Sequence, residues 1–111
     1  MKKIYKYPIG IAELEWFTIP VGSELLTVKL QNNVPFLWAL IDTEQTVHVL
    51  CAIFCVETGK IIPNNWNKSN YLNTVLILND KKVFHFFGVI NEEEEIEPPK
   101  AEYARWTAIE S

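Results

Sequence analysis

The amino-acid sequence predicts an all-β protein of about seven antiparallel strands, arranged as a small sandwich or barrel and followed by a short C-terminal helix. Segments rich in β-branched and aromatic residues recur at short intervals between turn-forming residues, and no long helical pattern occurs before residue 91. Hydrophobic residues make up 49% of the 111 residues and charged residues 22%, which is enough apolar surface for one folded domain.

The predicted strands follow one another with short connections. Residues 24–31, ELLTVKLQ, show the pattern most clearly, because apolar and polar side chains alternate from Leu26 to Gln31. Alternation with a period of two is typical of a strand with one buried face. From this pattern and from their β-branched and aromatic content, we expect strands at residues 4–9, 13–20, 24–31, 34–42, 47–56, 71–79 and 82–90.

Turn-forming residues mark the boundaries between these strands. Asn32 and Asn33 separate two strands and tolerate a positive φ, which favours a tight turn between them. Val21-Gly22-Ser23 and Asp80-Lys81-Lys82 are further turn signals. The second of these predicts a hairpin that joins residues 71–79 to residues 82–90.

Two of the predicted strands are apolar on both faces. Residues 34–42 and 47–56 carry hydrophobic side chains at nearly every position, so we expect both to lie centrally in a sheet or at a subunit contact. One small domain has little room to bury two-faced strands, and exposed apolar strands promote aggregation. The pattern therefore predicts a homo-oligomer.

The C-terminal residues differ in composition from the rest of the chain. Residues 92–99 form an acidic segment closed by two prolines, which predicts a solvated linker after a β-domain at residues 1–91. Residues 100–111 then predict a helix with a narrow apolar stripe of Tyr103, Trp106 and Ile109. This helix either packs on its own domain or docks on a neighbouring subunit.

The charge distribution limits the classes of partner. The net charge is −4, but residues 1–91 carry eight Lys/Arg against seven Asp/Glu, whereas residues 92–111 carry two against seven. The main body lacks the basic stripe that duplex nucleic acid requires. A signal peptide and a long apolar run are also lacking, so we expect no membrane contact and a place in a cytosol.

No catalytic signature stands out in the sequence. Cys51 and Cys55 are too far apart in a strand to pair, since four residues span roughly 13 Å and a disulfide needs Cα atoms within about 7 Å. We interpret them as small core residues, and His48 and His85 as structural residues. Phosphate-loop, dinucleotide and zinc motifs do not occur. The sequence predicts a protein that is not an enzyme and that uses no cofactor or metal.

The connection at residues 58–71, TGKIIPNNWNKSNY, combines the chemistry of a ligand site. Asparagine amides offer hydrogen-bond donors and acceptors, aromatic rings offer stacking faces, and lysines offer positive charge. In the alternative interpretation, the tryptophan covers the core as a plug and the segment is only a connection. The ligand interpretation predicts a site for a base and a phosphate made of Lys60, Asn64, Asn65, Trp66, Lys68 and Tyr71.

Several short motifs occur in a fixed order between residue 4 and about residue 87. They are Lys6-Tyr7-Pro8, Ile19-Pro20-Val21-Gly22-Ser23, Leu26 to Gln31, Asn33-Val34-Pro35, Leu37-Trp38-Ala39-Leu40-Ile41-Asp42, Thr58-Gly59-Lys60, Ile62-Pro63, Tyr71-Leu72-Asn73-Thr74 and Val83-Phe84-His85-Phe86-Phe87. In this order they resemble a family of small, largely uncharacterised proteins encoded by phages and prophages. This chain departs from that family at Lys60, where a histidine is common, and in its C-terminal extension.

The resemblance implies a phage origin and a setting in the host cytoplasm, and it supplies no catalytic residues. Small phage domains without catalytic motifs are often inhibitors of host defence, which is an analogy of context. The resulting hypothesis is a binding protein that sequesters a small nucleotide-derived immune signal of the host. The alternatives are a protein–protein inhibitor of a host defence factor and a phage structural or assembly accessory.

Overall fold

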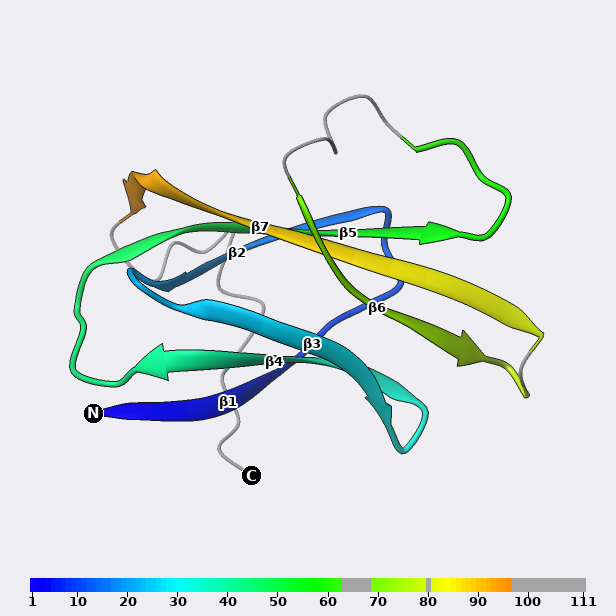
Figure 1. Ribbon diagram of the computed structural model, residues 1–111, viewed down its shortest axis with the longest axis horizontal. Helices are drawn as coiled ribbons and strands as arrows, with labels where there is room; N and C mark the ends of the chain where they lie inside the picture. The colour runs from blue at the N-terminus through cyan, green and yellow to red at the C-terminus, as the bar shows by residue number, and fades with distance from the viewer. Residues whose placement is uncertain (63–68, 80, 97–111) are drawn as a thin grey trace.

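The computed structural model of the chain describes residues 1–62, 69–79 and 81–96, and for residues 93–96 it describes the backbone alone (Figure 1). Seven strands lie within these residues, which confirms the predicted all-β class. The strands are β1 (Lys2–Pro8), β2 (Leu14–Pro20), β3 (Glu24–Gln31), β4 (Val34–Asp42), β5 (His48–Glu57), β6 (Asn70–Ile77) and β7 (Lys82–Ile96).

The strands form two antiparallel sheets that face each other as a sandwich (Figure 1). One sheet has three strands in the order β1-β4-β3, and the other has four in the order β2-β5-β7-β6. The sequence left a sandwich and a barrel open, and the structure decides for the sandwich. As predicted, the two strands with apolar residues on both faces, β4 and β5, lie at interior positions of their sheets.

The core fills the space between the sheets. In β4 every second residue from Pro35 to Ile41 is buried, while in β5 all seven residues from Val49 to Cys55 are buried. The inward side chains of β5 belong to the main core, and Ala52 and Phe54 form a second cluster on the outer face of the same sheet. Both faces of β5 are therefore buried within one chain. This strand by itself gives no reason to expect a second subunit.

The two cysteines are core residues, as predicted. Cys51 and Cys55 are buried on the inward face of β5 and are not joined in a disulfide. Burial raises the pKa of the Cys51 thiol well above its usual range, and it raises the pKa of Cys55 to about 12, with a smaller effect from the nearby Glu15. Both thiols therefore stay protonated near neutral pH.

Two tight turns use residues with positive φ. The predicted turn between β3 and β4 is confirmed, with φ of 52° at Asn32 and 64° at Asn33. The hairpin of β6 and β7 is also confirmed, but β6 ends at Ile77 rather than at residue 79. Leu78 and Asn79 lie in its turn with φ of 58° and 57°. For a leucine this conformation is strained, because its Cβ crowds the backbone.

The last strand is longer than the sequence predicted. We expected a strand to residue 90 and a solvated linker at residues 92–99, but β7 continues to Ile96 and pairs along β5 as far as His48. Strand pairing uses backbone groups, so a row of acidic residues can join a sheet when a partner strand is available. Residues 97–99 of the predicted linker and the predicted helix at 100–111 lie outside the described residues.

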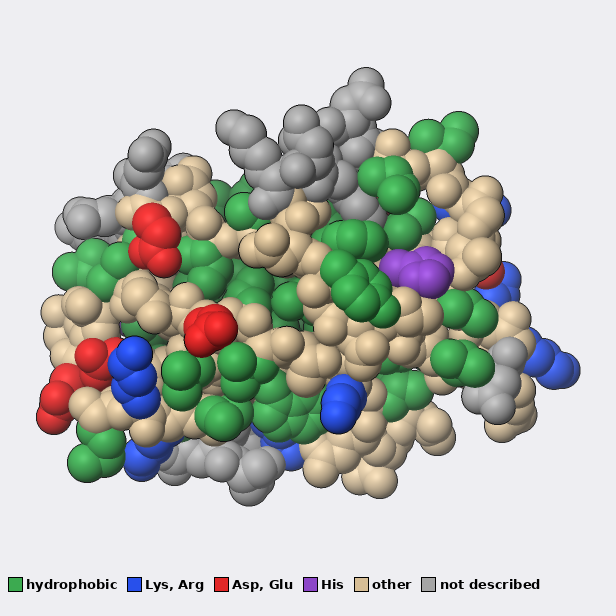
Figure 2. Space-filling model, viewed as in Figure 1, with side chains coloured by type: hydrophobic (Ala, Val, Ile, Leu, Met, Phe, Trp, Pro, Cys, Tyr) green, Lys and Arg blue, Asp and Glu red, His purple; other side chains and the backbone are tan. Residues whose placement is uncertain are grey.

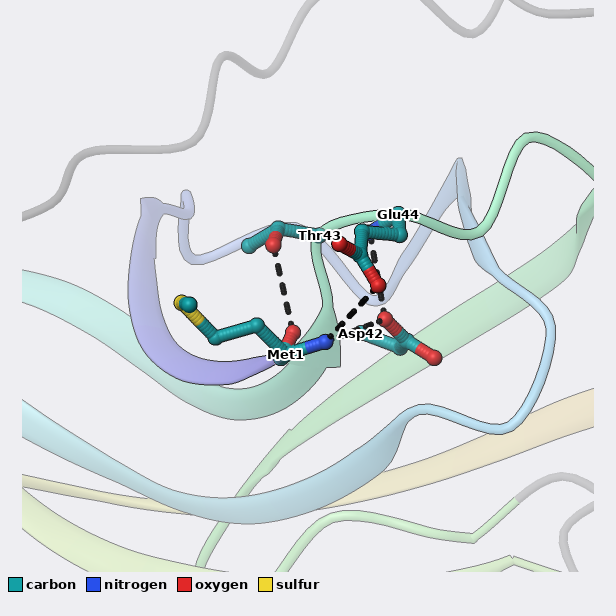
Figure 3. Close-up of polar contacts among 4 residues, drawn as sticks. All are labelled: Met1, Asp42, Thr43 and Glu44. Carbon is teal, nitrogen blue, oxygen red and sulfur yellow. Dashed lines mark hydrogen bonds and ion pairs between the residues drawn. The ribbon is translucent and has the colours of Figure 1, made fainter.

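Polar contacts of Met1, the residue before β1, attach the start of this strand to the end of β4 (Figure 3). The Thr43 amide donates to the Met1 carbonyl at 2.9 Å, and the terminal amine lies 3.4 Å from Asp42 Oδ1 and 3.2 Å from Glu44 Oε2. The backbone amide of Glu44 also donates to Asp42 Oδ1 at 3.1 Å, and this bond is the main cause of a lowered pKa of Asp42. These exposed contacts lie beside the first pair of the β1–β4 register, in which Lys2 faces Asp42.

Candidate functional site

The structure places two of the six residues predicted to form the ligand site. Lys60 follows β5, and Tyr71 lies in β6 at the other end of the same connection. The remaining predicted residues, Asn64, Asn65, Trp66 and Lys68, lie outside the described residues. The two ends of the predicted site are therefore known, and each belongs to a different local arrangement.

The Lys60 end borders a hollow of about 320 Å³, which we name the strand-end hollow. It lies where β5 ends and β7 begins, beside the connection between β1 and β2. The Lys60 amide donates to the Glu57 carbonyl at 3.0 Å, and Gly59 has a φ of 89°, which a glycine adopts without strain. This turn carries the chain back over the end of β5. The described residues that line the hollow are Ile11, Glu13, Cys55, Val56, Glu57, Lys60, Ile61 and Phe84.

Three charged side chains line this largely apolar hollow. Glu57 is held by Lys82, whose Nζ lies 3.1 Å from Glu57 Oε2. The carboxylate of Glu13 has no ion-pair or hydrogen-bond partner among residues 1–62, 69–79 and 81–96. Lys60 is exposed. The hollow thus offers apolar walls, one acceptor carboxylate without a described partner, and one cation open to solvent.

A chain of hydrogen bonds crosses the base of the connection at His85. Thr58 Oγ1 lies 2.7 Å from His85 Nε2, and Thr74 Oγ1 lies 2.8 Å from His85 Nδ1. The Tyr71 hydroxyl lies 2.6 Å from Thr74 Oγ1. Thr58 and Tyr71 are the first and last residues of the 58–71 connection, so one histidine links both ends of it. A threonine hydroxyl can donate or accept, which lets the chain run in either direction.

The ring of Tyr71 is held by a packing contact, in addition to the hydrogen bond of its hydroxyl group. Tyr71 packs edge-to-face on Phe87 with ring centroids 5.6 Å apart, yet 58% of the residue stays exposed. Tyr71 does not contribute to the lining of the strand-end hollow. The structure therefore joins Tyr71 to the histidine network through Thr74, whereas Lys60 lines the strand-end hollow, and the two residues do not share one pocket.

The cysteine and the histidine nearest to these features are buried or already hydrogen-bonded. Cys55 borders the hollow, but its thiol stays protonated because burial raises its pKa, so it is a poor nucleophile. Both ring nitrogens of His85 are occupied by threonine hydroxyls. Within the described part of the chain, no group of three or more His, Cys, Asp and Glu side chains is arranged to hold a metal ion.

Sequence reasoning missed most of the residues that form these two features. It interpreted His85 as a structural residue and gave no role to Thr58 or Thr74. The hairpin was predicted, but its register was not, because the turn lies at Leu78 and Asn79 rather than at Asp80-Lys81-Lys82, and this shift sets Thr74 opposite His85. Similarly, nothing in the sequence pattern brings Ile11 and Glu13 to the ends of β5 and β7, since that contact depends on how the sheets are connected.

Comparison with known proteins gives a family but no function. The chain belongs to the family described as a domain of unknown function, DUF7352, whose sequence profile matches residues 1–97. No curated protein and no solved structure matches the chain. The match includes the acidic end of β7, which the sequence had suggested was part of an extension. Among the described residues, no helix has the length and apolar character needed to cross a bilayer.

Proposed function

We propose that the protein is a non-enzymatic binding protein of phage origin that captures a small nucleotide-derived signal of host defence in the host cytoplasm. The observation that carries this proposal is the strand-end hollow beside Lys60. Its volume of about 320 Å³ is at the lower end of the range for small-molecule sites, and such sites usually combine apolar walls with a few polar groups. The phage origin rests on the resemblance of the sequence motifs.

The charges in the hollow suggest how a nucleotide would be oriented. Glu13 and Glu57 would repel a phosphate group inside the hollow, whereas a carboxylate accepts hydrogen bonds from the amino groups of a base. The apolar walls, which include Phe84 and Ile61, suit the faces of a flat ring. We therefore place the base in the hollow and the phosphate outside it, next to the exposed Lys60.

A thermal-shift screen with cyclic and linear nucleotides tests this proposal. A ligand at one hundred times its dissociation constant stabilises the folded state by about 2.7 kcal/mol, which is easily detected. We expect Lys60→Ala to weaken the stabilisation, and we expect Lys29→Ala, which removes an exposed lysine from the other sheet, to leave it unchanged. If no nucleotide stabilises the wild-type protein, the proposal is wrong.

A protein–protein inhibitor of a host defence factor is the second candidate. Ile61 is 92% exposed and Ile11 is 44% exposed at the hollow, and an exposed apolar group of this kind suits a protein surface. Native mass spectrometry of the purified protein separates the two candidates. A nucleotide that co-purifies favours capture of a small molecule. A protein that carries no nucleotide favours the protein–protein inhibitor or the assembly accessory.

Self-association is part of the same proposal. Because β5 is buried within one chain, the expectation of a second subunit now depends on the outer face of β4. On this face Val34 is 43% exposed, and Phe36 and Trp38 are partly buried. Ile4 of the neighbouring β1 is 53% exposed. A second subunit would cover this face. Light scattering that gives a mass of 12.9 kDa at high micromolar concentration would contradict it.

A further inference from the structure

A second hollow, of about 440 Å³, opens at the edge of the sandwich, and we name it the edge hollow. It lies between the beginning of β3 in one sheet and β6 and β7 in the other. On the face shown in Figure 2, hydrophobic side chains form the bottom of a recess, and acidic side chains lie beside it. The described residues that line the edge hollow are Ser23, Glu24, Leu25, Asn70, Leu72, Gly88, Val89, Ile90 and Glu92.

The edge hollow exists because β6 is shorter than β7. The pairing of these strands begins at Asn70, which faces Gly88, and no described strand lies on that side of Val89 and Ile90. Next to this point, two side-chain bonds close the edge of the sandwich. Thr27 Oγ1 donates to the Leu72 carbonyl at 3.2 Å, and Asn73 Nδ2 donates to the Val28 carbonyl at 2.8 Å. Beyond these bonds the two strand edges separate and leave the hollow.

The chemistry of the edge hollow is apolar below and acidic at the side. Leu25, Leu72 and Ile90 supply aliphatic surface. Glu24 and Glu92 are exposed, and neither carboxylate has an ion-pair partner among the described residues. The side chain that matches both features is a lysine or arginine, because its methylene stem packs on apolar surface while its charged end meets a carboxylate.

The same charges disfavour a second copy of this chain as the occupant. Two copies that paired along their β7 edges would bring their acidic residues together, and like charges on neighbouring strands destabilise a sheet. An extended basic segment has the opposite property. An added strand supplies backbone partners to an open edge, and its side chains provide the specificity.

We propose that the edge hollow and the adjoining edge of β7 bind an extended, basic peptide segment of a partner protein. The segment lies beside Val89 and Ile90, in line with β6. One of its lysine or arginine side chains enters the hollow between Glu24 and Glu92. This site is separate from the strand-end hollow, and its two carboxylates differ from those of the proposed nucleotide site.

Fluorescence anisotropy of the full chain with a labelled six-residue peptide that alternates valine and lysine tests the proposal. We expect saturable binding that weakens between about threefold and tenfold when Glu24→Gln and Glu92→Gln are combined. Glu44→Gln removes an exposed carboxylate at the connection between β4 and β5, and it should leave the affinity unchanged. Amide NMR shifts should be largest at Val89, Ile90 and Asn70.

Two comparison peptides separate strand pairing from simple charge attraction. A peptide that alternates valine and glutamate should not bind, and a lysine peptide with N-methylated amides should bind much more weakly because it cannot pair with β7. The proposal is overturned by equal binding of either comparison peptide or by an unchanged affinity of the double variant. Lack of binding of the lysine peptide at millimolar concentration also overturns it.

Discussion

Gly88→Ala should destabilise the sandwich, because three side chains converge on the place that a Cβ atom would occupy. A Cβ at Gly88 would lie 2.7 Å from Leu25 Cδ1, 2.9 Å from Ile53 Cδ1 and 3.0 Å from Leu72 Cδ1. Carbon atoms pack best at about 3.5–4.0 Å, so all three methyl groups must move. Leu25 belongs to the opposite sheet, and the added carbon therefore acts on the spacing between the sheets.

The size of the effect follows from two opposing contributions. Overpacking of a core by one carbon costs about 1–3 kcal/mol. Alanine also restricts the unfolded chain relative to glycine, which returns about 0.5–1 kcal/mol. The contacting atoms are the ends of flexible side chains, so we expect a net loss of about 1–2 kcal/mol, or a fall in Tm of about 5–10 °C.

A double-mutant cycle in urea denaturation tests the proposed cause. Leu25→Val shortens the side chain that makes the closest approach, so it should recover about half of the loss caused by Gly88→Ala. Gly59→Ala is the control, because Gly59 has a φ of 89° and open space around it. Leu25→Val should not rescue that variant. A Gly88→Ala protein as stable as wild type, or strictly additive effects with Leu25→Val, would refute the packing argument.

Three further predictions concern the hairpin turn, the histidine network and the loss of stability at acid pH. Leu78→Gly should raise the free energy of unfolding by about 0.5–1 kcal/mol by relieving a positive φ, whereas Leu76→Gly, in the adjoining strand, should lower it. Equal effects in urea denaturation would contradict the strain argument. His85→Phe should lose about 1–2 kcal/mol because two hydrogen bonds disappear, and thermal unfolding unchanged from wild type would count against the network. The pKa of Asp42 lies below its ordinary value of 3.8, so its contribution is present above that pH and is lost as the pH falls through the lowered pKa. In the Asp42→Asn variant, Tm should therefore fall less steeply with decreasing pH than in the wild type. An equally steep fall of Tm in both proteins would contradict this role of Asp42.

The strand-end hollow and the edge hollow differ in what they would recognise, and this difference gives separate readouts. Lys60 is the exposed cation at the first, whereas Glu24 and Glu92 make the second acidic. A variant of Lys60 should change nucleotide binding without changing peptide binding, and Glu92→Gln should do the reverse. The failure of one proposal would therefore leave the other standing.

The local sequence determined which segments became strands and where the chain turns. Alternation in residues 24–31, apolar density in residues 34–42 and 47–56, and the Asn32–Asn33 pair act over a few residues, so they can be recognised without knowledge of the fold. The burial of Cys51 and Cys55 follows from the same local pattern, because both lie on the same face of one apolar strand.

Tertiary structure alone decided the choice of a sandwich, the length of β7 and the positions of both hollows. The composition of the acidic end of β7 predicts a linker. This segment nevertheless pairs with β5, because the hydrogen bonds of strand pairing join backbone groups and do not require uncharged side chains. Glu13 reaches the end of β5, and Glu24 reaches the edge of β7, through connections between sheets that no short pattern encodes. Contacts between residues far apart in the chain depend on strand order and sheet packing. Both are set only when all seven strands pack together around one core.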